Sequence, residues 1–125
     1  MSNNAAIEAL SAFQASDKFR CEEPQFTMLN PSRSSVTRPW EDTLNRCASD
    51  LASLIQVGAS TAKLQSCIAA SIGSVKKPFD TEDREYLAYY YDQLGHCAGL
   101  RVGPLLNRWL YGPVLGTLLR LFSRD

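Results

Sequence analysis

The stretch that decides the fold is KPFDTEDREYLAYYYDQLG, residues 77–95. Pro78 disfavours an earlier helix start, and Asp80 or Thr81 is a typical N-cap, because its side-chain oxygen can accept a hydrogen bond from the first turn. Apolar and aromatic residues then recur at three and four residues, which is the period of one helix face. The pattern predicts a helix from Asp80 or Thr81 to about Ala98, ended by Gly99. Its expected buried residues are Leu87, Tyr90, Tyr91, Leu94, Cys97 and Ala98, with Tyr86, Tyr89 and His96 on the flank.

Helical periodicity recurs on both sides of this stretch. No segment shows the strict alternation of a strand, and glycines or prolines separate the periodic segments. The fold class expected is therefore all-α, a compact bundle of about five or six helices. Besides the helix above, the expected helices run from Asn3 or Asn4 to about Ala15, from an N-cap at Thr37 to Gly58, from an N-cap at Ser60 to Gly73, from Pro104 to a break at 111–113, and from Val114 to about Phe122.

Residues 16–39 have a different composition. Pro24, Pro31 and Pro39 fall here, together with the turn signal Asn30-Pro31-Ser32. We therefore expect a long N-terminal loop or arm. A loop of this length inside a compact domain is uncommon, so it is expected to be functional or to wrap the bundle. Its candidate anchors on the core are Phe19, Phe26, Met28 and Leu29.

Size and charge narrow the class of protein. The chain has 125 residues, which is the size of a single domain spanning 1–125. Its 13 basic and 13 acidic residues cancel, so charge favours neither nucleic acid nor an anionic membrane as a partner. No apolar run is long enough for a transmembrane helix, and the first residues lack the pattern of a secretory signal. The location expected is the cytoplasm.

Cys21, Cys47, Cys67 and Cys97 are too far apart in sequence for the usual zinc or redox motifs. Three of them fall on apolar helix faces, where a thiol behaves as a small hydrophobe. Buried free cysteines are the main expectation, with disulfides and a reactive thiol as the alternatives.

The acidic and aromatic residues of the 77–95 stretch are the candidate binding site. Carboxylates in a first helical turn are stabilised by the helix dipole, which is the simplest explanation of this cluster. A patch for a basic protein partner is the second explanation, and a divalent-cation site is the third, although the spacing is not that of an EF-hand. Tyrosine is enriched at protein-binding hot spots. The predicted partner-binding residues are Asp80, Glu82, Asp83, Glu85, Tyr86 and Tyr89.

No catalytic, cofactor-binding or metal-binding residue is predicted. His96 is the single histidine, and no known nucleophile or phosphate-binding motif occurs. The enzyme alternative is a hydrolase that uses a carboxylate of the 80–85 turn with His96 or Arg84, completed by polar residues from 30–38. Helix geometry opposes it, because His96 lies roughly 16–20 Å from that turn along the axis.

The segments FDTEDREY, residues 79–86, and LLNRWLYG, residues 105–112, resemble a family of small uncharacterised bacterial proteins. That family has a D-T-E-D-R-E helix start and a C-terminal L-N-x-W-L-Y-G element. The resemblance covers residues 79–112 well and the N-terminal half loosely. It implies a compact helical domain and supplies no established activity.

The function expected is that of a protein-binding module. More specifically, we expect an immunity or antitoxin-like protein that neutralises an antibacterial toxin or effector by direct binding. Two alternatives stay open: the hydrolase described above, and a structural homodimer that uses the final helix as its seam.

Overall fold

The computed structural model describes residues 3–19, 34–75 and 81–106. These residues form the helices α1 (Asn3–Ala15), α2 (Ser34–Gln56), α3 (Thr61–Ser74) and α4 (Thr81–Cys97), followed by a helical turn at 103–106. Strands are absent from the described ranges, and the predicted all-α class is confirmed. The helix expected at 114–122, with its homodimer seam, lies outside the described residues.

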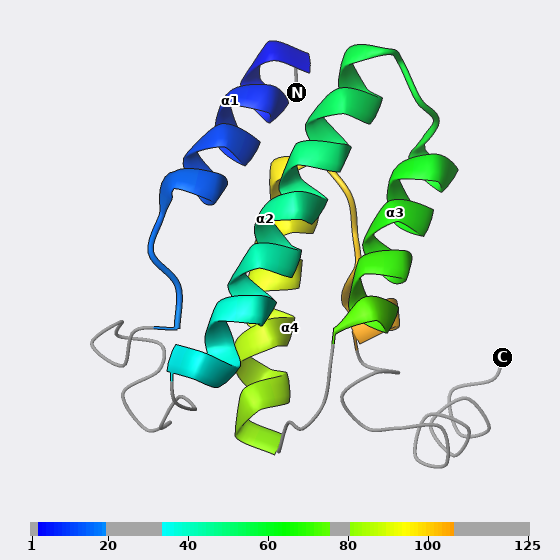
Figure 1. Cartoon of the computed structure of the whole chain (residues 1–125). Helices are drawn as coiled ribbons and strands as arrows, with labels where there is room; N and C mark the ends of the chain where they lie inside the picture. The colour runs from blue at the N-terminus through cyan, green and yellow to red at the C-terminus, as the bar shows by residue number, and fades with distance from the viewer. Residues whose placement is uncertain (1–2, 20–33, 76–80, 107–125) are drawn as a thin grey trace, which may run out of the picture.

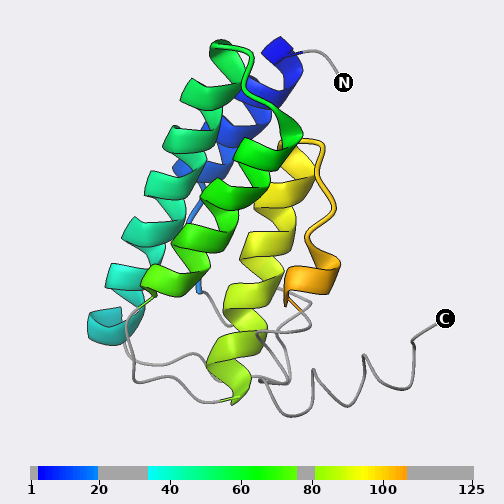
Figure 2. The same cartoon turned by 90° about the vertical axis from the view of Figure 1, so that its right-hand side faces the viewer.

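The helices form an antiparallel bundle. Helices α1, α2 and α3 lie side by side, and α4 lies behind α2 (Figure 1). Helix α4 contacts each of the other three, and after it the chain turns back and runs along α4, as Figure 2 shows. The short connection at 57–60 makes α2 and α3 antiparallel neighbours, as expected from its length. Of the described helices, none is long and apolar enough to cross a membrane.

The core lies where the inward faces of the four helices meet. On α2 the buried side chains recur at steps of four and three residues, so one stripe of this helix is removed from water. Burial of each large apolar side chain contributes about 1.5–3 kcal/mol, before entropy is counted. The buried residues of α2 include Trp40, Leu44, Cys47, Leu51 and Ile55, and those of α3 are Leu64, Ile68 and Ile72. These stripes confirm the predicted ones, apart from Leu54, Cys67 and Ser71, which are half-buried.

The ends of the helices agree well with their capping residues. The Ser60 hydroxyl accepts a hydrogen bond from the Lys63 backbone N–H at 3.2 Å, so Ser60 is the predicted N-cap of α3. Gly58 and Gly99 have φ of +75° and +74°, values that only glycine adopts without strain. The stop predicted at Gly73 is wrong by one residue, because α3 continues to Ser74.

Replacing Ser60 by Ala is expected to lower the free energy of unfolding by about 1 kcal/mol, because the Lys63 N–H loses its partner. Urea unfolding followed by circular dichroism measures this loss. Ser53→Ala is the matched control. Ser53 is exposed to solvent within helix α2, where alanine is tolerated or favourable. Equal effects of the two changes would contradict the capping role.

The start of α2 differs from the expectation. The helix begins at Ser34, so Pro39 lies inside it, and Thr37 is buried instead of capping a first turn. A proline this close to the helix start removes one hydrogen bond. Burial of the neighbouring Trp40, which is 2% exposed, offsets that loss. The arm predicted over 16–39 is therefore too long at its C-terminal end. Residues 20–33, with the anchors expected at Phe26, Met28 and Leu29, lie outside the described ranges.

Candidate functional site

The acidic residues at the start of α4 do not share one surface. Asp83 is buried, with 4% of its surface exposed, whereas Glu85 is exposed. Asp83 precedes the buried Tyr86 and Leu87 by three and four residues, so all three lie on the inward face of the helix. Asp80 and the side chain of Glu82 lie outside the described residues. The predicted patch is therefore divided between the interior and the surface.

Tyr86 belongs to the core, and its predicted place on the flank of the helix is wrong. It is completely buried, and its ring centroid lies 6.2 Å from that of Phe19. Phe19 also packs against Trp40 at 6.0 Å, so three aromatic rings from distant parts of the chain meet here. The i, i+4 spacing of Tyr86 to the buried Tyr90 is the sequence signal for this position.

The segment after α1 is fixed to this aromatic cluster. The Phe19 N–H donates a hydrogen bond to the Tyr90 hydroxyl at 2.8 Å, and the two rings lie 5.0 Å apart. The buried Lys18 Nζ donates to the carbonyls of Phe13 at 2.6 Å and of Ser16 at 3.0 Å. Its ammonium thus satisfies carbonyl groups at the C-terminal end of α1, where a cation is favoured. The predicted role of Phe19 as an anchor is confirmed.

An exposed stripe runs along α4. Four residues, Glu85, Tyr89, Asp92 and His96, follow one another at steps of four, three and four, so they lie on one side of the helix. Glu85, Asp92 and His96 are exposed and Tyr89 is half-buried. The α4 stripe consists of Glu85, Tyr89, Asp92 and His96.

Tyr89 is held in place on this stripe. Gln93 Nε2 donates a hydrogen bond to the Tyr89 hydroxyl at 2.6 Å. The Tyr89 ring packs edge-on against Tyr90 with centroids 5.3 Å apart. Because a fixed side chain loses little entropy when it is covered, Tyr89 is a good anchor for a partner.

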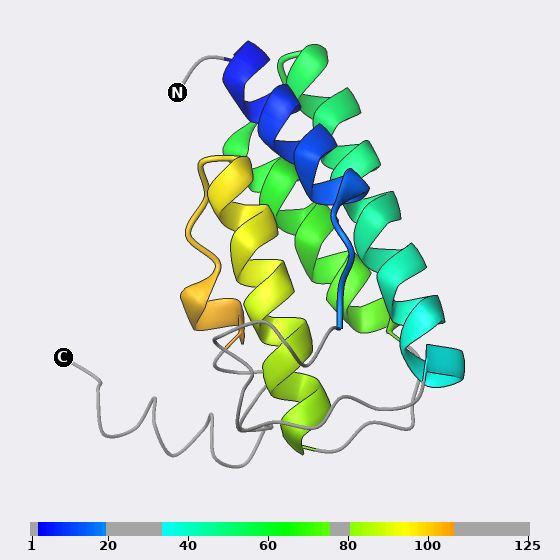
Figure 3. The same cartoon turned by 90° about the vertical axis from the view of Figure 1, so that its left-hand side faces the viewer.

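A groove lies between α1 and α4 beside the stripe. Figure 3 shows both helices facing the viewer, and the groove between their side chains has a volume of about 570 Å³. Helix α1 contains no Lys or Arg, and the sequence of α4 has one Arg and four acidic residues, of which Asp92 lines the groove. The carboxylate of Asp92 on the α4 wall therefore favours a positively charged group of a partner. The groove is lined by Ala9, Ala12, Phe13, Ser16, Asp92, Gln93, His96 and Cys97.

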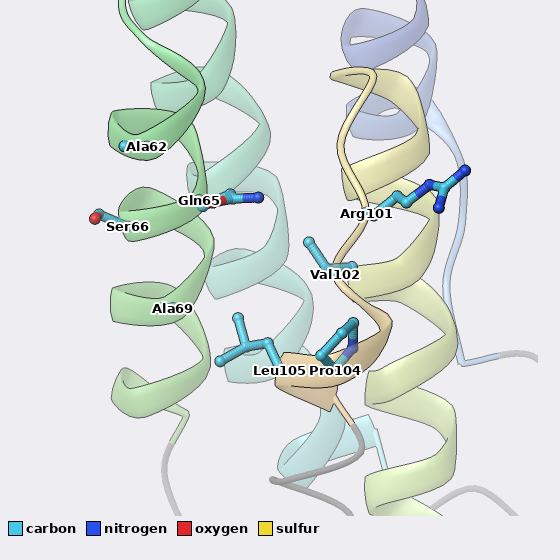
Figure 4. A pocket seen from close by; sticks show the side chains of 8 residues that line it. All are labelled: Ala62, Gln65, Ser66, Ala69, Arg101, Val102, Pro104 and Leu105. Atoms are coloured by element: carbon cyan, nitrogen blue, oxygen red, sulfur yellow. The ribbon is translucent and has the colours of Figure 1, made fainter. Parts of the chain in front are cut away.

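A second hollow lies between α3 and the segment that follows α4 (Figure 4). Its volume is about 480 Å³, and Val102 and Leu105 point from that segment toward α3. Gly95 allows the same segment to pack closely on α4, because a Cβ atom at residue 95 would lie 2.9 Å from Val102 Cγ2. Arg101 is the one titratable side chain in the lining of this hollow, whereas Asp92, His96 and Cys97 line the α1–α4 groove.

The described cysteines agree with the main expectation. Cys47 is buried, Cys67 and Cys97 are half-buried, and all three are free; Cys21 lies outside the described residues. Burial raises the pKa of Cys97, which lies in the α1–α4 groove beside His96. A thiol with a raised pKa is largely protonated at neutral pH and is a weak nucleophile.

The geometry bears on the chemistry that this surface supports. Glu85 and His96 are separated by roughly 16 Å along α4, which is too far for one to orient the other. Within the described ranges, no group of three or more His, Cys, Asp or Glu side chains is arranged to hold a metal ion. The α4 stripe presents two carboxylates, an aromatic ring and an imidazole along one side of the helix.

Comparisons with known proteins give two matches. The sequence matches a family described as a domain of unknown function, DUF4844, over residues 1–114. Among solved structures, a DUF3571 family protein from Acinetobacter baumannii AYE is similar, with 25% sequence identity and a TM-score of 0.78. That similarity covers 94% of this chain and 97% of the other. No curated protein matches the chain.

These matches support the predicted resemblance to a small uncharacterised bacterial family, although they do not bear on its two short motifs. The bacterial neighbour shares the helical fold over nearly its whole length. Since the family match spans most of the sequence, the chain belongs to the DUF4844 family.

Proposed function

We propose that this protein is a binding module for another protein, with the α4 stripe and the α1–α4 groove as its contact surface. The observation that carries the proposal is the position of Tyr89, fixed by Gln93 beside a groove of about 570 Å³ that Asp92 lines. An aromatic anchor beside a partly apolar hollow is typical of protein-binding hot spots.

The charges specify the kind of partner. Glu85 and Asp92 are exposed on the stripe, and α1 adds Glu8 without any Lys or Arg. A partner with Lys or Arg side chains around an apolar contact would complement this surface. Exposed charges of this kind raise the association rate and the specificity more than the affinity.

The more specific role that we propose is that of an immunity or antitoxin-like protein. An acidic surface can cover the basic face of a toxin that binds phosphate groups, and so exclude its substrate. Direct occlusion requires no catalytic group in the binding protein. Support for this role comes from the charge of the stripe and the similarity to a bacterial protein of the same fold.

Charge reversal on the stripe tests the proposal. In a capture experiment from the source organism, followed by titration of the captured protein, Glu85→Lys with Asp92→Lys is expected to weaken binding on the order of tenfold. Asp42→Lys with Asp50→Lys is the matched control, since these residues are exposed on α2 and change the net charge equally. Both variants should retain the wild-type circular dichroism spectrum.

Two results would count against the proposal. Equal weakening by both double variants would show that net charge matters and the stripe does not. A folded bait that captures no stoichiometric protein would remove the basis for a binding module. The specific role has its own readout, because co-expression with the captured protein should relieve growth inhibition by that protein.

A further inference from the structure

Two cysteines from different helices line one hollow. Cys47 of α2 and Cys67 of α3 are 20 residues apart in sequence and meet at a hollow of about 360 Å³ between these helices. Both are free; Cys47 is 2% exposed, while Cys67 is half-buried. The other residues of the lining are Thr43, Arg46, Asp50, Ala70, Ser71 and Ser74.

The two thiols lie close enough to influence each other's ionisation. Beyond the effect of burial, Cys67 raises the pKa of Cys47, whereas Cys47 lowers the pKa of Cys67. These directions are those expected when the inner thiol donates toward the outer sulfur. Ser71, whose hydroxyl lies 2.9 Å from the Tyr91 hydroxyl, opposes the effect of burial and lowers the pKa of Cys47. Cys67 is therefore the outer, accessible sulfur of the pair, and Cys47 is the inner one.

We propose that Cys47 and Cys67 form a redox-active pair, which a small-molecule disulfide oxidises to an intramolecular disulfide between α2 and α3. This pair is separate from the α4 stripe, so the inference stands independently of the proposed binding function.

The reaction balances with one oxidant molecule, RSSR. The Cys67 thiolate, formed by loss of a proton to solvent, attacks one sulfur of RSSR; a Cys67–SR bond forms and the first RS⁻ leaves. Cys47, after losing its proton, then attacks Cys67 Sγ; the Cys47–Cys67 bond forms and the second RS⁻ leaves. The two leaving groups take up the two protons as RSH. The protein is thereby oxidised by two electrons and RSSR is reduced to two thiols.

The surroundings of the pair raise the pKa of both thiols, so the reaction should be slow at neutral pH and faster at higher pH. Burial raises the pKa of Cys47 to about 12 and also raises that of Cys67. Asp50 raises both pKa values further. Arg46 lines the same hollow. Tyr91 of α4 has a pKa that is itself raised by burial. Only the thiolate attacks, so below the pKa of Cys67 the rate should rise by about tenfold per pH unit.

The test uses the full chain with Cys21 and Cys97 replaced by Ser, treated with oxidised glutathione between about pH 7 and pH 9. The expected result is an intact mass lower by two hydrogen atoms and a peptide map that links Cys47 to Cys67. Cys47→Ser in this background should stop at a mixed disulfide on Cys67, and Cys67→Ser should react more slowly, because its remaining thiol is buried. The peptide map of the wild-type chain gives the same answer if a variant does not fold.

Thermal unfolding provides a second readout. The cross-link closes a short loop between α2 and α3, so the oxidised protein should unfold roughly 10 °C higher, and a reductant should reverse the shift. The inference would be overturned by a folded protein that yields only the mixed disulfide. It would equally be overturned by a link that forms only in denaturant, or by oxidised protein that unfolds at a lower temperature.

Discussion

Tyr86→Ala is expected to reduce the free energy of unfolding by about 3–5 kcal/mol. Its side chain is completely buried, and its ring lies against Phe19, which also packs on Trp40. Truncation removes the buried ring and leaves a cavity that the helices around it fill only in part. A small domain is stable by about 5–15 kcal/mol in total, so this change consumes a large fraction of its stability.

Tyr89→Ala is the matched control for Tyr86→Ala. It removes the same atoms three residues later on the same helix, from a half-buried site. We expect a loss of about 1 kcal/mol, from the contact with Tyr90 and the hydrogen bond of Gln93. Urea unfolding of both variants measures the difference between them. If the two losses were equal, Tyr86 would not be the core residue that the structure shows.

Phe19→Ala is expected to cost about 3 kcal/mol, and Phe19→Gly is expected to cost less. Phe19 is 8% exposed and packs against Trp40, Tyr86 and Tyr90, so either change removes this packing. Its φ of 63° lies in the left-handed region, which costs a residue with a Cβ about 1–2 kcal/mol. Glycine avoids that cost but loses about 0.5–1 kcal/mol through the entropy of the unfolded chain.

The glycine variant should therefore be more stable than the alanine variant by about 0.5–1 kcal/mol. Because this difference is small, the midpoints of urea unfolding should be compared at a shared denaturant slope, without long extrapolation. The hydrogen bond from the residue 19 N–H to Tyr90 is available to both variants, so it cancels from the comparison. An alanine variant that is more stable than the glycine variant would contradict the left-handed conformation at this position.

The candidate site was only partly predictable from the sequence. Glu85 and Tyr89 do lie at the surface, but the patch expected around them is divided, because Asp83 and Tyr86 face the core. The exposed continuation of the surface, through Asp92 and His96, was not predicted as a binding site. The sequence did contain a signal for it: from Glu85, these residues follow at steps of four, three and four, which places them on the side of the helix away from the core.

The sequence by itself determined the features that depend on neighbouring residues. Helical periodicity predicted the inward stripe of α2. The residue type of Ser60 predicted the N-cap of α3, and Gly58 and Gly99 predicted the ends of helices. These signals are local, since capping and amphipathic spacing act over a few residues along the chain. The all-α class follows from the same signals.

Only the tertiary structure decided which segments meet. Phe19 adopts a left-handed conformation because α2 and α4 hold its ring, and no local signal favours that conformation for phenylalanine. The groove between α1 and α4, and the hollow that Cys47 and Cys67 both line, likewise require residues that are distant in sequence to lie together. Helix periodicity shows which face is buried and does not show which partner covers it, because any apolar surface of suitable shape removes that face from water equally well.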